Sequence, residues 1–222
     1  MRTITEPSGA TRLWYETSEI EQITAQALRD ASLWPDGGGS AVDIEHLLEV
    51  HMSVAIDYGA PLDPAVLGYT SFESPIRVVI NRALTESAQR SGAGCAAVGR
   101  WRATLAHEAA HILLHARLFD PASGRVDELP SPCLRTEVGT SKATDWREVQ
   151  ANMGMAALLV PRPIVAAALR PLLLRENAIP PVPSATPMAY RMTGELTRLF
   201  AVSRQLARIR LVEMGMIASD LD

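Results

Sequence analysis

The 222-residue sequence predicts an α+β fold, with helices first, a small sheet next and further helices after it. Segments rich in β-branched residues gather between residues 52 and 80, while the flanking regions carry the three-to-four-residue apolar spacing of helices. Hydrophobic residues make up 47% of the chain and charged residues 21%, a globular composition that argues against extensive disorder.

The N-terminal region is predicted to contain a leader and one helix. Residues 1–14 are polar and lack the apolar stretch of a secretory signal, so we expect a loose leader. Residues 17–33 have helical periodicity, and Ser18 and Glu21 have the Ser-x-x-Glu spacing of a capping box. The glycine-rich residues 36–40 end this helix.

The middle region is predicted to hold a short helix and the sheet. Asp43 is placed to cap a helix that runs to His51. The candidate strands are residues 52–58, 66–73 and 76–80, of which the last is the clearest. Residues 81–96 are rich in serine, glycine and alanine, and we expect a flexible connection there.

Two strong helices are predicted in the second half of the chain, over residues 99–119 and 145–160. The loop between them, residues 120–144, contains proline, serine and glycine and could act as a lid or a substrate contact. After a proline-rich break at residues 180–187, residues 192–217 form a last helical unit.

Three of the five histidines fall within a span of nine residues, inside the first of these helices. One face of that helix is an apolar stripe, formed by Leu105, Ala109, Ile112, Leu113 and Ala116. His107, Glu108, His111 and His115 occupy a sector roughly opposite, where a surface helix would carry ordinary charged residues. The pattern therefore predicts a buried helix with a polar pocket against one side.

Residues 107–111 form a His-Glu-x-x-His motif. Residues four apart lie one turn apart on the same face, so the imidazoles of His107 and His111 can bind one zinc ion. Glu108 then points beside the metal, where it can take a proton from a metal-activated water and pass it to a leaving amine. The alternative is a structural helix whose partly buried histidines are hydrogen-bonded.

A catalytic zinc needs a third protein ligand, and the second helix offers Glu148. Spacing alone leaves two interpretations open, because Asp145 and Glu148 also have the spacing of a capping box. Asn152 lies one turn after Glu148, where it can orient that carboxylate or the substrate, or be an ordinary amide on the helix face.

Both segments resemble one known family. Arg102-Ala-Thr-Leu-Ala-His-Glu-Ala-Ala-His-Ile-Leu-Leu-His115 is similar to the active-site helix of the ImmA/IrrE metallopeptidases. Glu148-Val-Gln-Ala-Asn152, followed by Ala156-Ala-Leu-Leu-Val-Pro161, resembles the second signature of that family. Looser similarity extends the resemblance over about residues 40–217.

The resemblance implies a zincin-like metallopeptidase fold, with zinc held by His107, His111 and Glu148 and with Glu108 as the general base. Mn²⁺ is the expected activating substitute. Family members are cytoplasmic proteases that cleave or inactivate helix-turn-helix repressors, often encoded nearby, and so switch on stress, phage or mobile-element genes. The resemblance thus implies a zinc-dependent endopeptidase whose partner is such a repressor.

The implied domains are an N-terminal leader and helix over residues 1–40, a zincin-like peptidase domain over residues 41–190, and a C-terminal helical segment over residues 191–222 packed on it. The chain departs from the family pattern at packing positions. Ala110 stands where glycine usually precedes the second motif histidine, and Ala103 and Gly154 stand where an aromatic residue is usual. These departures bear on substrate fit more than on metal binding.

Two further features have predicted roles near the site. His115 lies one more turn along from His111 and would diverge from the first ligand by about 80°, so we expect it to support the ligands or the structure. A sheet edge formed by residues 66–73 or 76–80 is expected to bind the substrate peptide by strand addition.

The C-terminal segment resembles a helix-turn-helix. Residues 196–211 have the pattern of a helix, a short turn with Ser203 as N-cap, and a second helix with Arg204 and Arg208 on one face. We favour a packed helical hairpin over direct DNA binding, because the chain has a net charge of −4 and a protein that coats nucleic acid is usually basic.

The sequence also predicts a cytoplasmic protein that does not enter a membrane. Two cysteines do not make a disulfide framework, and the most apolar zone, residues 153–174, is broken by arginines and prolines. The rival to an enzyme is a non-catalytic anti-repressor that acts only by binding its partner.

Overall fold

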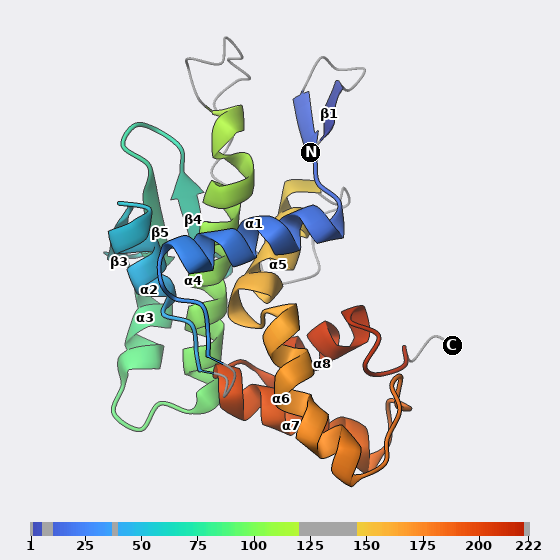
Figure 1. The fold of residues 1–222 in the computed structure, drawn as a ribbon. Coiled ribbons are helices and arrows are strands. Elements are labelled where there is room, and N and C mark those ends of the chain that lie inside the picture. The colour runs from blue at the N-terminus through green and yellow to red at the C-terminus, as the bar shows by residue number, and fades with distance from the viewer. Residues whose placement is uncertain (1, 6–10, 37–39, 120–145, 220–222) are drawn as a thin grey trace.

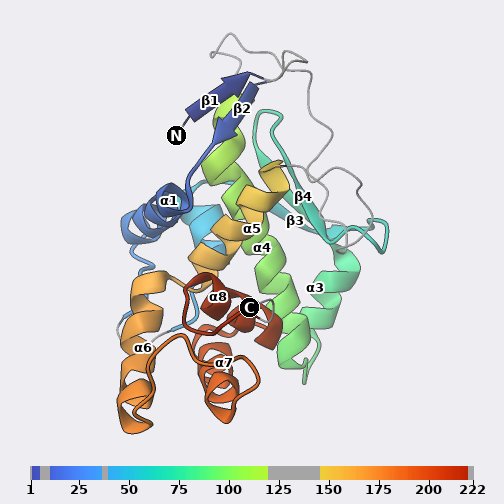
Figure 2. The ribbon, with the colours of Figure 1, turned by 90° about the vertical axis from the view of Figure 1, so that its right-hand side faces the viewer.

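A long helix, α4 (Cys95–His115), runs through the middle of the structure, with a small sheet on one side and further helices on the other (Figures 1 and 2). The computed structural model describes residues 2–5, 11–36, 40–119 and 146–219. The loop over residues 120–144, and with it the lid role suggested above, lies outside the described residues.

The first half of the chain contains both short strands and helices, and the named elements of the second half are helical. The first half contains β1 (Arg2–Thr5), β2 (Thr11–Trp14), α1 (Thr17–Asp30), α2 (Ile44–His46) continued by a π-helical turn (Leu47–His51), β3 (Ala55–Ala60), β4 (Gly68–Ser71), β5 (Arg77–Asn81) and α3 (Arg82–Gln89). After α4 come a 3₁₀ turn (Ala116–Leu118), α5 (Trp146–Leu159), α6 (Arg162–Arg175), α7 (Pro187–Phe200) and α8 (Arg204–Glu213). The predicted α+β class is confirmed.

The main sheet has three strands in the order β3-β5-β4, with β3 parallel and β4 antiparallel to β5. The central strand is β5, whose Val78 and Ile80 are fully buried. The prediction that residues 76–80 could form the edge is therefore wrong, because both sides of this strand are paired. The other candidate, residues 66–73, contains β4, which is an edge strand among the strands that the structure describes and packs against α4.

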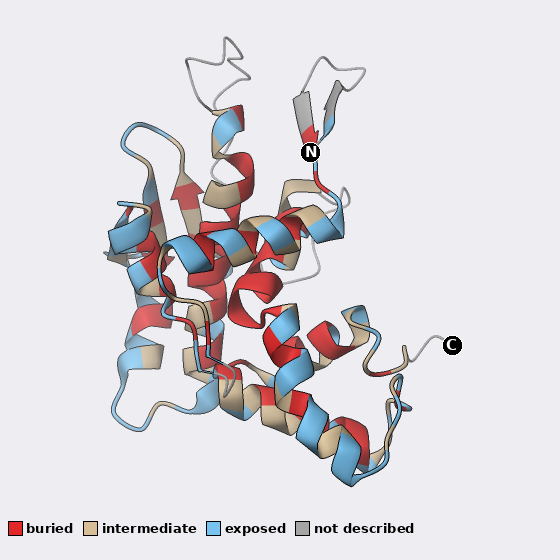
Figure 3. Ribbon diagram, viewed as in Figure 1, coloured by how far each residue is buried: buried red, intermediate tan, exposed pale blue. Residues whose placement is uncertain are grey.

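The core lies where α4 packs along α5 and under α1. Figure 3 shows both central helices largely buried, whereas the outer face of α1 is exposed. Small buried residues let the axes of α4 and α5 approach closely, among them Ala106, Ala109 and Ala110 on α4 and Ala151 and Ala157 on α5. The prediction of a buried helix over the histidine motif is confirmed.

The expected loose leader is wrong for the described residues near the N-terminus. Strands β1 and β2 form an antiparallel hairpin, and Leu13 and Tyr15 are buried against Leu114 and Leu118 of the α4 end. The hydroxyl of Tyr15 donates a hydrogen bond to the carbonyl of Leu114 at 3.0 Å. The burial of these apolar side chains orders a segment that we had expected to be a loose leader from its average polarity.

Two local predictions fail and two hold. Residues 82–89 form α3, capped by Asn81, where a flexible connection was expected, because Leu84 and Thr85 face the core. Helix α1 is capped at Glu16, whose N–H donates to Glu19. Ser18 and Glu21 are therefore not its capping box. The predicted caps Asp43 and Ser203 are both confirmed, by bonds from the backbone N–H groups three residues on.

Candidate metal centre

Two helices bring three metal-binding side chains together. His107 and His111 lie one turn apart on α4 and are fully buried, and Glu148 lies in the first turn of α5. The Nε2 atoms of the two histidines are 3.0 Å apart. Glu148 places Oε2 3.1 Å from Nε2 of His107 and Oε1 3.2 Å from Nε2 of His111.

This donor set fits a divalent transition metal. Ligand bonds of about 2.0–2.1 Å in a tetrahedral site put neighbouring donor atoms roughly 3.3 Å apart, close to the spacing observed here. Two imidazoles and one carboxylate are also the ligand types of catalytic zinc sites with three protein ligands. The ligand atoms of His107, His111 and Glu148 thus form a candidate metal-binding group.

The carboxylate of Glu148 is held ionised by its surroundings. Burial opposes its charge, but the hydrogen bonds from His107 and His111 outweigh burial and lower the pKa of Glu148 well below its usual range. Asp145, the other half of the alternative capping box, lies outside the described residues. The structure turns both oxygens of Glu148 toward the histidines, as a ligand requires.

Glu108 lies beside the two histidines on α4, turned toward the sheet. It is fully buried, and its Oε2 accepts a hydrogen bond of 2.9 Å from the hydroxyl of Thr70 on β4. No described residue donates a hydrogen bond to its Oε1. Burial raises the pKa of Glu108, although the neighbouring histidines and Thr70 act in the lowering direction. The carboxylate is therefore poised to accept a proton.

His115 lies behind His111, on the side away from Glu148. Its Nδ1 is 3.1 Å from Nδ1 of His111, and its Nε2 is 3.1 Å from Oε1 of Gln150. Its ring also meets the edge of Trp146 in a T-shaped contact, with ring centroids 5.4 Å apart. The structure thus places His115 next to a candidate ligand and outside the metal-binding group.

Asn152 is exposed on α5, and the structure shows no hydrogen bond from its side chain to any other described residue. Sequence reasoning missed two buried polar residues, Thr70 and Gln150. No local signal marks Gln150, because its partners Leu13 and His115 lie 137 and 35 positions away in the sequence. Thr70 could have been found as a polar residue at an inward position of β4, in phase with Gly68.

The comparisons with known proteins agree with this geometry. The family model for peptidase M78, described as the IrrE N-terminal-like domain, matches residues 95–212. The chain belongs to this family. No curated protein matches the chain. Membership supports a metallopeptidase, a hydrolase of peptide bonds, and the small sheet packed on helices is consistent with a zincin-like domain.

Two departures from the family pattern meet at one contact between α4 and α5. A Cβ atom added at Gly154 would lie 2.7 Å from the Cβ of Ala110. Position 154 therefore has no room for a side chain next to the methyl group of Ala110, and glycine there lets the two helices approach closely.

The C-terminal helices pack as a hairpin on the peptidase helices. Helix α7 ends at Ala201 in a left-handed conformation, and Ser203 caps α8. Arg210 is buried and donates to the carbonyl of Val160 at 3.0 Å, while Arg208 donates to the carbonyl of Ser184. Two arginines of the second helix are thus engaged within the fold.

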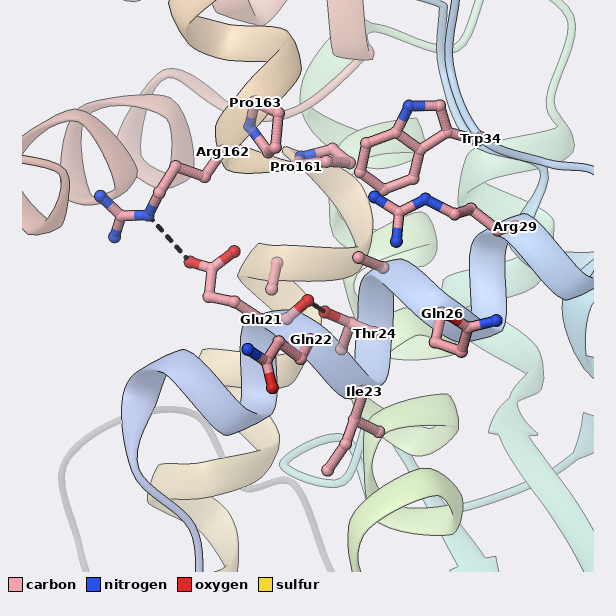
Figure 4. A pocket seen from close by; sticks show the side chains of 12 residues that line it. Glu21, Gln22, Ile23, Thr24, Gln26, Arg29, Trp34, Pro161, Arg162 and Pro163 are labelled. Carbon is pink, nitrogen blue, oxygen red and sulfur yellow. Dashed lines mark hydrogen bonds and ion pairs between the residues drawn. The ribbon is translucent and has the colours of Figure 1, made fainter.

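A separate groove of about 560 Å³ lies between α1 and the start of α6 (Figure 4). Its charged groups are turned toward their neighbours in the fold. Arg162 reaches Glu21 at 3.4 Å, and the guanidinium of Arg29 lies 4.4 Å from the ring centre of Trp34. None of the metal-binding residues lines this groove, so we assign it no part in the site.

The apolar stretch in the second half of the chain forms α5 and α6. No single helix among the described residues is long and apolar enough to cross a membrane. Helices α5 and α6 reach the required length and composition only when taken as a pair, and their junction is bent by 52°.

Proposed function

We propose that this chain is a zinc-dependent endopeptidase in which His107, His111 and Glu148 hold the metal and Glu108 is the general base. The observation that carries the proposal is the convergence of three donor atoms from two helices beside a buried carboxylate that has one free oxygen among the described residues. Mn²⁺ is the proposed substitute that can also activate the site.

The residues around the site divide the chemical work. A bound zinc ion would supply the Lewis acidity that activates water and polarises the scissile carbonyl. Glu108 receives a proton on Oε1 and passes it to the leaving amine, while Thr70 keeps the other carboxylate oxygen in place. The buried surroundings of Glu108 favour the protonated intermediate state that this transfer needs.

The edge strand β4 is the proposed binding strand for the substrate. It pairs with β5 on one side only among the described strands, and its Thr70 touches Glu108. A peptide that adds to this edge would hydrogen-bond to the β4 backbone and run beside the general base. This placement favours an extended segment of a protein as substrate.

We further propose that the substrate is a helix-turn-helix repressor encoded nearby, whose cleavage derepresses stress, phage or mobile-element genes in the cytoplasm. The support is the family resemblance together with the net charge of −4, which suits a basic DNA-binding partner. Direct DNA binding is not favoured, since Arg208 and Arg210 are engaged internally.

The decisive experiment is to incubate the purified chain, loaded with Zn²⁺ or Mn²⁺, with the helix-turn-helix regulator encoded in its own operon. Gel electrophoresis should show discrete fragments with the wild type and none with Glu108→Gln, which should retain about one zinc per chain. An intact regulator in a stable complex would favour a non-catalytic anti-repressor instead. A wild-type chain that binds no metal would contradict the proposal.

A further inference from the structure

A chain of hydrogen bonds leads from His111 away from the metal-binding group and ends on the backbone of the N-terminal hairpin. Nδ1 of His111 contacts Nδ1 of His115 at 3.1 Å, and Nε2 of His115 contacts Oε1 of Gln150 at 3.1 Å. The amide nitrogen of Gln150 donates to the carbonyl of Leu13, on β2, at 3.2 Å. Each of these four residues is at most 4% exposed.

The direction of every bond in this chain follows from its two ends. A backbone carbonyl only accepts, so the amide nitrogen of Gln150 faces Leu13 and its oxygen faces His115. An amide oxygen also only accepts, so Nε2 of His115 carries a hydrogen. At the other end, a histidine binds a metal only through an unprotonated nitrogen.

The same reasoning fixes the state of His111. With a metal on Nε2 of His111, the hydrogen of that ring lies on Nδ1 and is donated to Nδ1 of His115. Nε2 of His111 is also the atom that lies 3.2 Å from Glu148 in the metal-binding group. Without a metal, this Nε2 donates to the Glu148 carboxylate, which can only accept.

We propose that Gln150 and His115 are positioning residues that fix the tautomer and ring orientation of His111, with strand β2 as the outer end of the metal centre. The proposal rests on the proposed function, in which His111 binds the metal. It gives Gln150 and the N-terminal hairpin a role in the site that the signature residues alone do not reveal.

The hairpin is anchored independently of Gln150. Tyr15 follows β2 directly, and its hydroxyl donates to the carbonyl of Leu114 at 3.0 Å. Leu13 and Tyr15 also share a buried apolar cluster with Leu114 and Leu118. Tyr15→Phe is therefore a matched control, because it removes one buried hydrogen bond of the same hairpin and leaves the chain to His111 intact.

The first readout is the tautomer of each histidine in the zinc-loaded protein at slightly alkaline pH, measured by long-range ¹H–¹⁵N correlation spectroscopy. Only five histidines are present, and His46 and His51 are exposed, so the three buried rings can be assigned by substitution. We expect Nδ1–H for His111 and Nε2–H for His115. In Gln150→Leu the ring of His115 should become a mixture of tautomers, whereas Tyr15→Phe should keep the wild-type pattern.

The second readout is zinc affinity, measured by competition with a chromophoric chelator. Gln150→Leu and His115→Phe should each weaken zinc binding by about 10- to 100-fold, the range usual for loss of a partner behind a metal ligand. Because both act through one chain, the double variant should lose little more than either single variant. Tyr15→Phe should stay close to the wild type when compared as folded protein.

These measurements separate the two levels of the proposal. If Nε2 of His115 carries no hydrogen in the zinc-loaded wild type, or if Gln150→Leu binds zinc as tightly as the wild type, the positioning role is wrong. If the wild type binds no metal, the proposed function fails, whereas the hydrogen bond from His115 to Gln150 can still be detected in the metal-free protein. If the loss of zinc affinity in the double variant equals the product of the losses in the single variants, the two residues act separately.

Discussion

The two sides of α4 hold their catalytic candidates in different ways. On the side of α5, His111 is enclosed by Glu148 in front and by the chain through His115 and Gln150 behind. On the side of the sheet, Glu108 has one hydrogen bond, from Thr70, and one oxygen to which no described residue donates.

The difference matches the work proposed for each side. A metal ligand must keep one orientation and one protonation state, so each nitrogen of His111 has a fixed neighbour. A general base must gain and lose a proton, so one oxygen of Glu108 has to stay open. A metal-dependent hydrolase thus needs two things from this helix: a rigidly supported ligand, His111, and a general base, Glu108, with one oxygen open.

The largest expected effect is on the α5 side. His111→Ala removes a ligand and should abolish metal binding, because two remaining donors do not hold a catalytic zinc. Bound metal in the purified protein, measured by atomic emission, should fall from about one ion per chain to almost none. Val50→Ala, at an exposed position of the π-helical turn, is the control and should keep its metal. Full metal occupancy in His111→Ala would mean that His111 is not a ligand and that the α5 side of the helix does not hold the metal.

Glu108→Gln tests the sheet side with the opposite pattern. The amide keeps the shape of the side chain but cannot accept a proton, so peptide cleavage should fall by at least about 100-fold. The metal content should stay at the wild-type level, because Glu108 is not among the three converging donors. If Glu108→Gln loses its metal together with its activity, Glu108 is a ligand, and the two sides of α4 do not have separate roles.

A smaller effect is expected when the one support of Glu108 is removed. Thr70→Val should lower kcat/KM about tenfold, the equivalent of one hydrogen bond to a charged group, without changing metal content. Burial raises the pKa of Glu108, and the Thr70 bond acts against that rise. Removing the bond therefore raises this pKa further, and the acidic limb of the pH–rate profile should move to higher pH.

Thr70→Ser provides the control for this shift, since it keeps the hydroxyl that donates to Glu108. The profile of Thr70→Ser should coincide with the wild type. An acidic limb that stays in place in Thr70→Val would mean that another group, and not Glu108, sets it.

The sequence predicted the signature helices well and the contacts around them poorly. The motif fixes the spacing of His107 and His111 because both lie on one helix, and the apolar stripe shows that this helix is buried. Thr70 and Leu13 reach the site from strands that are 38 and 137 positions away from Glu108 and Gln150. Such pairings depend on how strands pack against α4, and no local pattern encodes that packing.

The N-terminal hairpin is a second case in which long-range packing overrides a prediction from local sequence. Average polarity predicted a loose leader over residues 1–14, yet Leu13 and Tyr15 bury enough apolar surface to order its described part. Likewise, Glu21 has the spacing of a capping residue but lies 2.6 Å from the buried Arg210, 189 positions later in the sequence. Long-range charge pairing outweighs a local cap when the partner would otherwise be buried alone.

The smallest expected effect concerns the contact that sets the distance between the α4 and α5 sides. Gly154→Ala places a methyl group 2.7 Å from the Cβ of Ala110, and neither atom can rotate away. Overpacking of this kind costs about 1–3 kcal/mol, part of which is offset by the better helix propensity of alanine, about 1 kcal/mol. Denaturant unfolding should therefore show a net loss of about 1 kcal/mol.

Ala110→Gly in the same protein should restore the space and recover much of this loss, giving a coupling energy of about 1 kcal/mol in the double-mutant cycle. Zinc affinity should fall in Gly154→Ala, because the helices that carry His111 and Glu148 are pushed apart. It should recover in the double variant. Additive stabilities, with no recovery, would mean that α5 relaxes freely along α4. The contact between positions 110 and 154 would then have no bearing on the metal centre.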